Sequence, residues 1–531
     1  MVGLVLVLPA FFGLLTGYLW PTIRTAWWSF QARQPFGGGG GGQWVGLDNY
    51  VRVLAQFGRT WGFAPVFAIM PLLTLAVVVP LLAIAAHRAG RRARWAVRLA
   101  LAVPMVCFAP VALAGGWQLD RFDLAGAQGS VFAAAFLRLG VVSAAWLSMF
   151  GLVCAIGVTV YLAVLRGRGP GPSAYLADLA VGALAVIVTL AVALQSFTYP
   201  YVMTQGGPAD QTLTPMLDTF RSGFLTLEFG AAAAQAMLVL VVLMVLGLGA
   251  ACVIILTGLR VEVDPSPHPA DGPSRRAGIR ATPALLAALG LFAVLAVTAY
   301  GLWPWLSRLG GLGPVDGPTA ISLLARTWLP PAVSAVVGVG LAAVAGFGIG
   351  ALRPLGRWSE LLLLPFAPWL FVGVGPLVLV WFDFARAIGL LDTFLGQIPP
   401  VWLAVPALFL FTVVFRGLAL RPAEPTVGAG ARYGRMLLWG LPMLVFVGGA
   451  TWLVQAQSLF WGLVSGNRNP TAPVWVVQQL GADPAARDAV SFGLVLPIPT
   501  LVIFAVGLGL LQVFYLDRLV IRVGTSPIDR R

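Results

Sequence analysis

The sequence predicts an all-α polytopic membrane protein, with about twelve transmembrane helices arranged in two halves of six. Of the 531 residues, 59% are apolar and only 10% are charged, whereas a soluble domain is about 45–50% apolar and about 25% charged. The mean hydropathy is +0.91. Apolar runs of about 20 residues, the length that crosses roughly 30 Å of hydrocarbon, recur along the whole chain.

These runs define twelve predicted spans, in chain order: 2–22, 62–86, 97–117, 141–165, 176–197, 231–258, 282–306, 330–352, 361–382, 396–415, 436–456 and 489–514. Backbone groups in lipid must pair internally, so the spans are predicted to be helices. Their interior prolines are expected to cause kinks packed against neighbouring helices. Prolines crowd the third and tenth runs, which are the weakest of the twelve as spans. The first run lacks the basic flank and the cleavage pattern of a signal peptide, so we expect it to stay as a span.

Arginine counting predicts the orientation. If both termini are cytoplasmic, 21 of the 33 arginines lie in cytoplasmic loops and the tail. The net charge of +14 then divides into about +13 inside and +1 outside, as the positive-inside rule expects. We therefore expect a multi-pass protein of the plasma (inner) membrane with both termini cytoplasmic. A nucleic-acid partner is not expected, because no soluble domain carries a basic face.

The sequence contains no lysine, which excludes several chemistries. A Walker A loop and a pyridoxal-phosphate enzyme both need one, so any ATP must be hydrolysed by another protein. His87 and His268 lie far apart, and no Cys, His and Asp cluster has the spacing of metal ligands. Asp178 is expected to act as a charge partner of a helix N-terminus. We expect no enzymatic activity, no cofactor and no metal.

A stretch rich in proline, glycine and charge at 260–281 predicts a flexible cytoplasmic linker. It separates a first half, 1–259, from a second half, 282–531, with six spans each. Leu19-Trp20-Pro21 and Leu302-Trp303-Pro304 repeat at an offset of 283 residues. Because six is even, the halves form a parallel repeat, and a translocation path is expected between them.

Three motifs of the first half resemble the first permease subunit of carbohydrate-type (maltose-like) ABC importers. They are the segment from Trp20-Pro21 through Ser29-Phe30 to Val45–Leu54, then Leu194–Pro208, then Phe229–Ala234. In the second half, Gly389–Gly396, Phe415–Leu418 and Gln457–Trp461 resemble the partner permease of the same systems. The resemblance covers nearly the whole chain and joins two subunits that are usually separate.

The resemblance implies a fused permease pair that moves a small solute, a sugar or oligosaccharide, across the plasma membrane, with membrane lipid around it. Its implied partners are a cytoplasmic ABC ATPase dimer and an extracytoplasmic solute-binding protein. The family's coupling loop to the ATPase corresponds here to Glu424, Gly430, Leu441 and Pro442, with Glu424-Pro425-Thr426 in place of Glu-Ala-Ala. The first-half loop, 166–175, lacks the motif. We therefore expect coupling mainly through 421–442, or a degenerate relative with weak or lost transport.

Polar groups at membrane depth are costly and are therefore candidates for function. The candidate translocation path comprises Gln195, Tyr199, Gln235, Gln455, Gln457 and Trp461. Glutamine amides can bond sugar hydroxyls while aromatic faces stack on sugar rings. For each residue alone, the competing interpretation is a hydrogen bond between helices or a place in the interfacial aromatic belt.

Other classes stay open at this point. A major-facilitator-type secondary transporter also has twelve helices in two halves, and Gly90-Arg91 and Gly356-Arg357 resemble its loop motif without the expected aspartate. A fused thiamine, iron or polyamine ABC permease and a transport-inactive membrane scaffold are further alternatives. An intramembrane enzyme would need converging ionisable residues in the spans, and the sequence lacks them.

Overall fold

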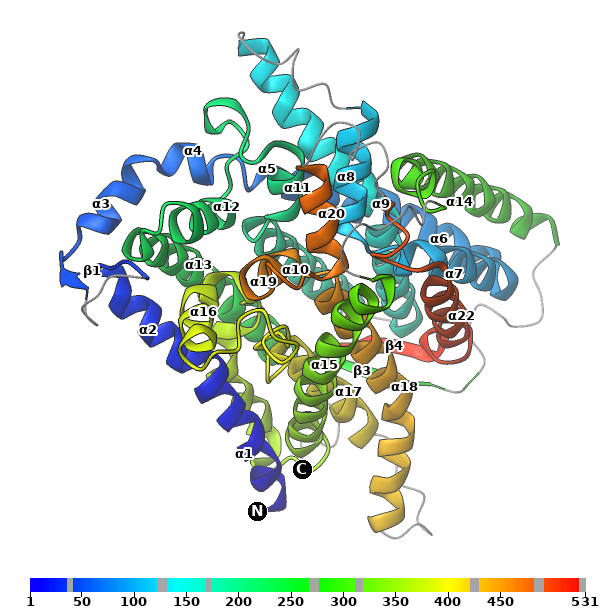
Figure 1. Cartoon of the computed structure of the whole chain (residues 1–531). Helices are drawn as coiled ribbons and strands as arrows, with labels where there is room; N and C mark the ends of the chain where they lie inside the picture. The colour runs from blue at the N-terminus through cyan, green and yellow to red at the C-terminus, as the bar shows by residue number, and fades with distance from the viewer. Residues whose placement is uncertain are drawn as a thin grey trace.

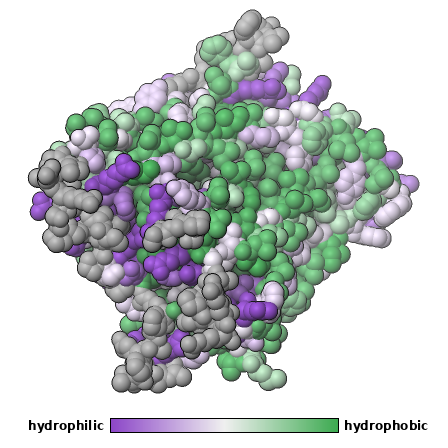
Figure 2. Space-filling view, turned by 180° about the vertical axis from the view of Figure 1, so that it is seen from behind, coloured by the Kyte–Doolittle hydropathy of each residue, from purple (hydrophilic) through white to green (hydrophobic). Residues whose placement is uncertain are grey.

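The computed structural model is a bundle of long apolar helices (Figure 1). It describes residues 1–35, 42–121, 131–168, 173–264, 266, 277–310, 319–420, 429–481 and 491–524. Within these ranges, nine helices are long and apolar enough to cross a membrane, and a bent pair makes a tenth. Large apolar side chains point outward along them, and Figure 2 shows a broad hydrophobic area on one side of the molecule. The chain is a multi-pass membrane protein.

The first half is built from thirteen α-helices and short connecting elements. In order they are α1 (Val2–Leu14), a π-helical turn (Leu15–Leu19), α2 (Trp20–Ser29), β1 (Gln31–Ala32), β2 (Gln43–Trp44), α3 (Asp48–Ala55), α4 (Phe57–Trp61), α5 (Val66–Leu73), a π-helical turn (Thr74–Val78), α6 (Val79–Ala89), α7 (Arg91–Val106), α8 (Pro110–Arg121), α9 (Val131–Gly167), α10 (Ser173–Leu194), α11 (Thr198–Thr204), a 3₁₀ turn (Pro208–Asp210), α12 (Pro215–Phe220), a π-helical turn (Arg221–Leu225) and α13 (Phe229–Thr257).

The second half follows a strand, β3 (Arg260–Val263). Its elements are α14 (Ala277–Leu306), α15 (Ala320–Gly350), η7, a 3₁₀ helix (Gly356–Trp369), a 3₁₀ turn (Gly375–Leu377), α16 (Val378–Ala387), α17 (Val405–Ala419), α18 (Ala429–Ala456), α19 (Leu459–Ser465), α20 (Ala472–Leu480), α22 (Ile498–Phe514), a 3₁₀ turn (Leu516–Arg518) and β4 (Leu519–Arg522). Of the predicted linker 260–281, the first four residues form β3 and residues 277–281 belong to α14.

Three predicted spans depart from a continuous helix, so the count of twelve is not confirmed. The third is α7 and α8, bent by 80° between Val106 and Pro110. The ninth is the 3₁₀ helix η7, which contains Pro365 and Pro368, followed by α16. The tenth is α17, of only 15 residues. Proline, which lacks the amide hydrogen and clashes with the preceding helical turn, lies at each of these departures. It is not a sufficient cause, because α15 continues through Pro330 and Pro331.

The two halves exchange helices, and the exchange is symmetric. The first span of each half packs on the second span of the other: α1 lies against α15, and α14 lies against α6. The third span packs on the last span of the other half: α7 lies against α22, and η7 lies against α13. In span numbers, the contact of spans 1 and 8 corresponds to that of spans 7 and 2, and the contact of spans 3 and 12 corresponds to that of spans 9 and 6. The contacts therefore follow a pseudo-two-fold relation between the halves.

The ends of the even-numbered spans gather on one face, which we name the arginine-rich face. It carries Arg94, Arg98, Arg166, Arg260, Arg353, Arg416 and Arg522. The N-terminal end of α1 belongs to the same face, because a Cβ on Gly3 would lie 3.0 Å from the Gly348 carbonyl oxygen at the end of α15. The opposite face, with α3, α4, α11, α12 and α20, is named the distal face.

A two-stranded antiparallel sheet of β3 and β4 lies at the arginine-rich face. Val261 pairs with Ile521 and Glu262 pairs with Val520, so β3 at the end of the first half is bonded to β4 at the end of the second. The Arg166 guanidinium donates hydrogen bonds to the carbonyl oxygens of Asp517, Asp264 and Ser266 at 2.6–2.9 Å. The strands and this arginine therefore join the two halves at one point of the face.

Candidate functional site

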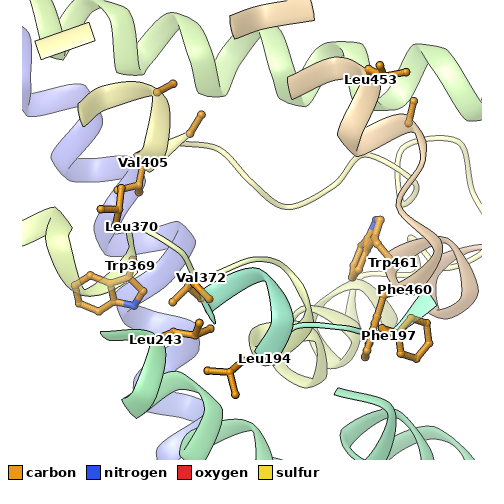
Figure 3. Close-up of a cluster of buried hydrophobic side chains, with 14 of the residues drawn as sticks. Leu194, Phe197, Leu243, Trp369, Leu370, Val372, Val405, Leu453, Phe460 and Trp461 are labelled. Carbon is orange, nitrogen blue, oxygen red and sulfur yellow. The ribbon is translucent and has the colours of Figure 1, made fainter. Parts of the chain in front are cut away.

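The candidate translocation path lies where the ends of two corresponding spans meet. They are the fifth span of the first half and the fifth span of the second half, which is the eleventh of the chain. Both spans are interrupted at corresponding places: α10 ends at Leu194 before α11, and α18 ends at Ala456 before α19. Phe197, just after the first break, has its ring centroid 4.5 Å from that of Phe460, just after the second. Figure 3 shows these two rings side by side with Trp461 next to them. The two breaks therefore face each other across the seam between the halves.

The same dipeptide lies at both breaks. Gln195-Ser196 follows the end of α10 and Gln457-Ser458 follows the end of α18. At the first break the amides of Gln195 and Ser196 bond carbonyls three residues earlier, which ends the α-helical pattern. The Thr214 hydroxyl donates to the Ser196 carbonyl oxygen at 2.6 Å and satisfies a group that the break leaves free. The Gln-Ser repeat was a signal in the sequence that the prediction of the path did not use.

Gln195 ties the halves together and has no free bonding capacity at its amide nitrogen. Its Nε2 donates to the carbonyl oxygens of Ala191, at 3.0 Å, and Phe371, at 2.8 Å. Its Oε1 accepts a bond from the Gly373 amide at 3.0 Å. Gln195 therefore bonds the non-helical connection at residues 371–373 of the other half.

The other glutamines keep unused polar atoms in buried surroundings. Gln457 donates through Nε2 to the Val495 carbonyl oxygen at 2.9 Å, but its Oε1 has no partner among the described residues. The Oε1 atom of Gln455 is likewise buried without a partner there. Gln235, in α13, is fully buried, and neither atom of its amide is bonded within the described part of the chain.

The two aromatic candidates follow the same pattern. Tyr199 in α11 is 8% exposed, and its hydroxyl is buried beside that of Ser148, without a hydrogen bond of normal geometry to any described residue. The Trp461 indole nitrogen in α19 is buried and unbonded in the same sense. A buried polar group without a partner costs about 1–3 kcal/mol. Five of the six predicted residues therefore present an atom that a water or a solute hydroxyl would satisfy.

A cavity of about 300 Å³ lies beside α11, the helix that carries Tyr199. It is formed by α8, α11 and α20, with Gln118, Tyr201, Thr204 and Gln205 as its polar lining. The Tyr201 ring stacks on Phe197 at 5.0 Å, which connects the cavity to the seam. None of the six predicted path residues lines it, so sequence reasoning missed this part of the site.

The structure places the predicted coupling residues on a long helix. Glu424 lies outside the described residues. Gly430 is exposed in the first turn of α18, and Leu441 and Pro442 lie farther along the same helix. Residues 429–442 are therefore continuous with the eleventh span. In the first half, α9 ends at Gly167 and α10 begins at Ser173. Residues 168–172 that connect them are fewer than residues 420–428 between α17 and α18.

Comparison with known proteins gives no family for this chain. No model of a protein family matches it, and no curated protein matches it. Among the described residues, no group of three His, Cys, Asp or Glu side chains is placed to hold a metal ion.

Proposed function

We propose that the chain is the membrane-spanning permease of an ATP-driven importer of the ABC type, with both permease subunits fused. The observation that carries the proposal is the pair of corresponding helix breaks, at Gln195-Ser196 and Gln457-Ser458, facing each other across the seam. Discontinuous helices at equivalent positions of two repeats are where transporters bind substrate. The symmetric exchange of helices supplies two bodies that can rock against each other around that site.

The chemistry of the seam favours a polyhydroxylated solute, a sugar or oligosaccharide. Amide, phenol and indole groups bond neutral hydroxyls. The rings of Phe197 and Phe460 pack on each other and give the seam an apolar wall. The path residues on this proposal are Tyr199, Gln235, Gln455, Gln457 and Trp461, whose buried atoms await a partner. Gln195 is a positioning residue that holds the break of α10 against residues 371–373.

An external energy source is part of the proposal. In the described spans, acidic residues lie near the helix ends; examples are Asp178, Glu360 and Asp517. A carrier driven by protons usually needs a carboxylate at membrane depth. The absence of lysine excludes a Walker A site in the chain itself. A separate cytoplasmic ATPase dimer, docking on the arginine-rich face, and an extracytoplasmic binding protein at the distal face complete the proposed assembly in the plasma membrane, with both termini cytoplasmic.

The two halves contribute unequally to coupling on this proposal. The exposed start of α18, with Gly430, is long enough to transmit a movement directly into the eleventh span. Only five residues, 168–172, connect α9 to α10. Replacing residues 429–434 with a glycine-serine segment should abolish coupling of ATP hydrolysis to uptake, while the same treatment of residues 168–172 should have a small effect.

Affinity purification of the full chain from its own membranes tests the proposal. The expected result is a co-purifying subunit with a Walker A motif, and uptake of radiolabelled maltose or trehalose into proteoliposomes of the complex when ATP is enclosed with the ATPase. The matched variants are Gln235→Leu, expected to lose uptake, and Gln118→Leu, at the cavity, expected to weaken it. Recovery of complexes without an ATPase, together with absence of uptake, would favour the membrane scaffold instead.

A further inference from the structure

Three arginines converge on one carboxylate at the distal face, between the two halves. Asp383 in α16 accepts a hydrogen bond from the Arg386 guanidinium at 2.9 Å through Oδ1. Its other oxygen, Oδ2, lies 3.8 Å from Arg24 in α2 and 3.7 Å from Arg33 after β1. α16 belongs to the second half and packs against α2 of the first (Figure 1). The cluster of Arg24, Arg33, Arg386 and Asp383 carries a net charge of +2.

Two of these arginines have unused donors. At 3.7 Å and 3.8 Å, the contacts of Arg33 and Arg24 with Asp383 are longer than hydrogen bonds. No described residue accepts a hydrogen bond from either guanidinium, and the Nε atoms of both are buried without a partner in the described ranges. A guanidinium has five N–H donors in a fixed fork. The single carboxylate, already bonded to Arg386, therefore leaves both buried Nε donors without an acceptor in the described residues, while the partly exposed head group of Arg24 also faces solvent.

Partial burial makes this arrangement electrostatically costly. The Arg33 and Asp383 side chains are only 18% and 17% exposed. Burial lowers the pKa of Arg33; the Asp383 charge raises it, and the charges of Arg24 and Arg386 lower it further. The lowered pKa shows that burial first, and the two neighbouring cations second, disfavour the charged form of Arg33. An additional anion would relieve that repulsion.

Tryptophans hold the guanidinium groups in place from the other side. Arg33 lies 4.4 Å from the ring centroid of Trp28, and Arg24 lies 5.3 Å from the same ring and 5.5 Å from Trp20. Trp28 is almost fully buried, so it fixes the two cations relative to each other. The arginines are therefore positioned before any ligand arrives, which lowers the entropy cost of binding one.

The surroundings match the interface between hydrocarbon and water. Trp20, Trp27, Trp44 and Phe384 are exposed by 38–57% around the cluster. Tryptophan is enriched at the level of lipid headgroups. In the predicted topology the charges of the outer side nearly balance, at about +1, whereas this cluster alone carries a net charge of +2. A basic cluster kept here, in an aromatic belt, calls for an anionic partner at headgroup depth.

We propose that Arg24, Arg33 and Arg386 form a binding site for a phosphate group at the distal face, bridging the two halves of the chain. Guanidinium forks match the oxygens of a phosphate, which can accept from two arginines at once. Two sources share this chemistry: the phosphodiester of an anionic phospholipid such as phosphatidylglycerol, and free phosphate or a phosphorylated solute. The site does not depend on transport, and its occupant would hold α2 and α16 together.

The experiment uses the full chain in phosphatidylcholine nanodiscs, with or without about 10 mol% phosphatidylglycerol. This fraction supplies several anionic lipid molecules per disc. Native mass spectrometry counts the phosphatidylglycerol molecules that stay bound. In the lipid-free arm, inorganic phosphate is titrated while the melting temperature is followed. Retention of phosphatidylglycerol with no response to phosphate assigns the site to the lipid, and stabilisation by phosphate alone assigns it to the free anion.

Variants make the result specific. The double variant R24Q/R33Q should lose about tenfold or more in affinity for whichever probe binds, because two charge-assisted partners are removed. Arg59→Gln, an exposed arginine at the same face but outside the cluster, should bind as the unaltered chain does. Asp383→Asn should bind more tightly, since it removes the competing carboxylate.

Opposite responses of R24Q/R33Q and Asp383→Asn also guard against a folding defect, because misfolding would weaken binding in both. Equal binding of both probes by R24Q/R33Q and the unaltered chain would overturn the proposal. So would binding of neither probe, or weaker binding by Asp383→Asn.

Discussion

Gly417 in α17 tests whether the sheet on the arginine-rich face joins the halves as closely as the structure indicates. A Cβ atom on Gly417 would overlap the carbonyl oxygen of Val261 in β3. The strand and the helix would have to separate by about 1 Å or more to reach an ordinary contact distance. Because β3 is bonded to β4, this displacement would act on both strands.

The magnitude of Gly417→Ala follows from two opposing effects. Overpacking of a tight contact costs about 1–3 kcal/mol. Replacing glycine by alanine inside a helix returns up to about 1 kcal/mol. The net loss of about 1–2 kcal/mol should raise the opening constant of the sheet by about 5–30-fold. Hydrogen exchange of the amides in 260–263 and 519–522, followed by mass spectrometry, measures that constant directly.

Gly434→Ala supplies the matched control. Gly434 also lies inside a helix, α18, but a Cβ there would meet nothing within 4 Å. This variant should leave the exchange of both strands unchanged and slightly protect its own helix. Gly167→Ala should behave like Gly417→Ala, because its Cβ would overlap the Ile521 carbonyl oxygen in β4. Unchanged exchange of the strands in Gly417→Ala, or an equal change in Gly434→Ala, would refute the close approach.

Three further predictions follow from buried polar groups. Asp517→Asn should cost about 3–5 kcal/mol and lower the yield of folded chain on size exclusion, because it leaves two buried arginines without their carboxylate; Glu228→Gln, in an exposed ion pair, should cost at most about 1 kcal/mol. Burial raises the pKa of Asp218 to about 6. Its contribution to stability is therefore complete below the unfolded pKa and is lost as pH rises through 6. The backbone amides of α12 should exchange their hydrogens more slowly at pH 5 than at pH 7.5 after correction for intrinsic rates, and Asp218→Asn should remove the difference. Gln195→Leu should lower the melting temperature by breaking three hydrogen bonds, whereas Gln235→Leu should leave it unchanged or raise it.

The membrane class and most spans follow from composition and run length alone, because a hydrocarbon slab imposes one length and one backbone solution on every span. The irregular spans were less predictable. Interior prolines were expected to cause kinks only, but the third span bends by 80° and the ninth, with Pro365 and Pro368, forms a 3₁₀ helix. The length of an apolar run shows that a segment can lie in the membrane. It does not show whether the neighbouring helices pack against a regular or an interrupted helix.

The linker shows a second limit of sequence reasoning. Proline and glycine at 264–272 favoured a flexible segment from 260 onward, yet Arg260–Val263 alternates polar and apolar residues and pairs with a strand more than 250 residues away. A four-residue strand is too short to recognise without its partner. At the path, the polar residue types identified Gln457 and Tyr199 as candidates, but only packing distinguished Gln195, whose amide is fully bonded, from Gln235, whose amide is not.

The irregular third span of each half has a common physical reason. The bent pair α7 and α8 lies against α22, and the 3₁₀ helix η7 lies against α13, so each third span packs on the last span of the opposite half. At the second of these contacts Gly247 lets α13 approach so closely that a Cβ would overlap the Ala367 carbonyl oxygen. A straight α-helix there would present side chains where η7 presents backbone. Both halves depart from the ordinary helix at the same position although their sequences there differ. The departure therefore belongs to the contact across the seam, which is the surface that must slide if the halves rock around the paired breaks.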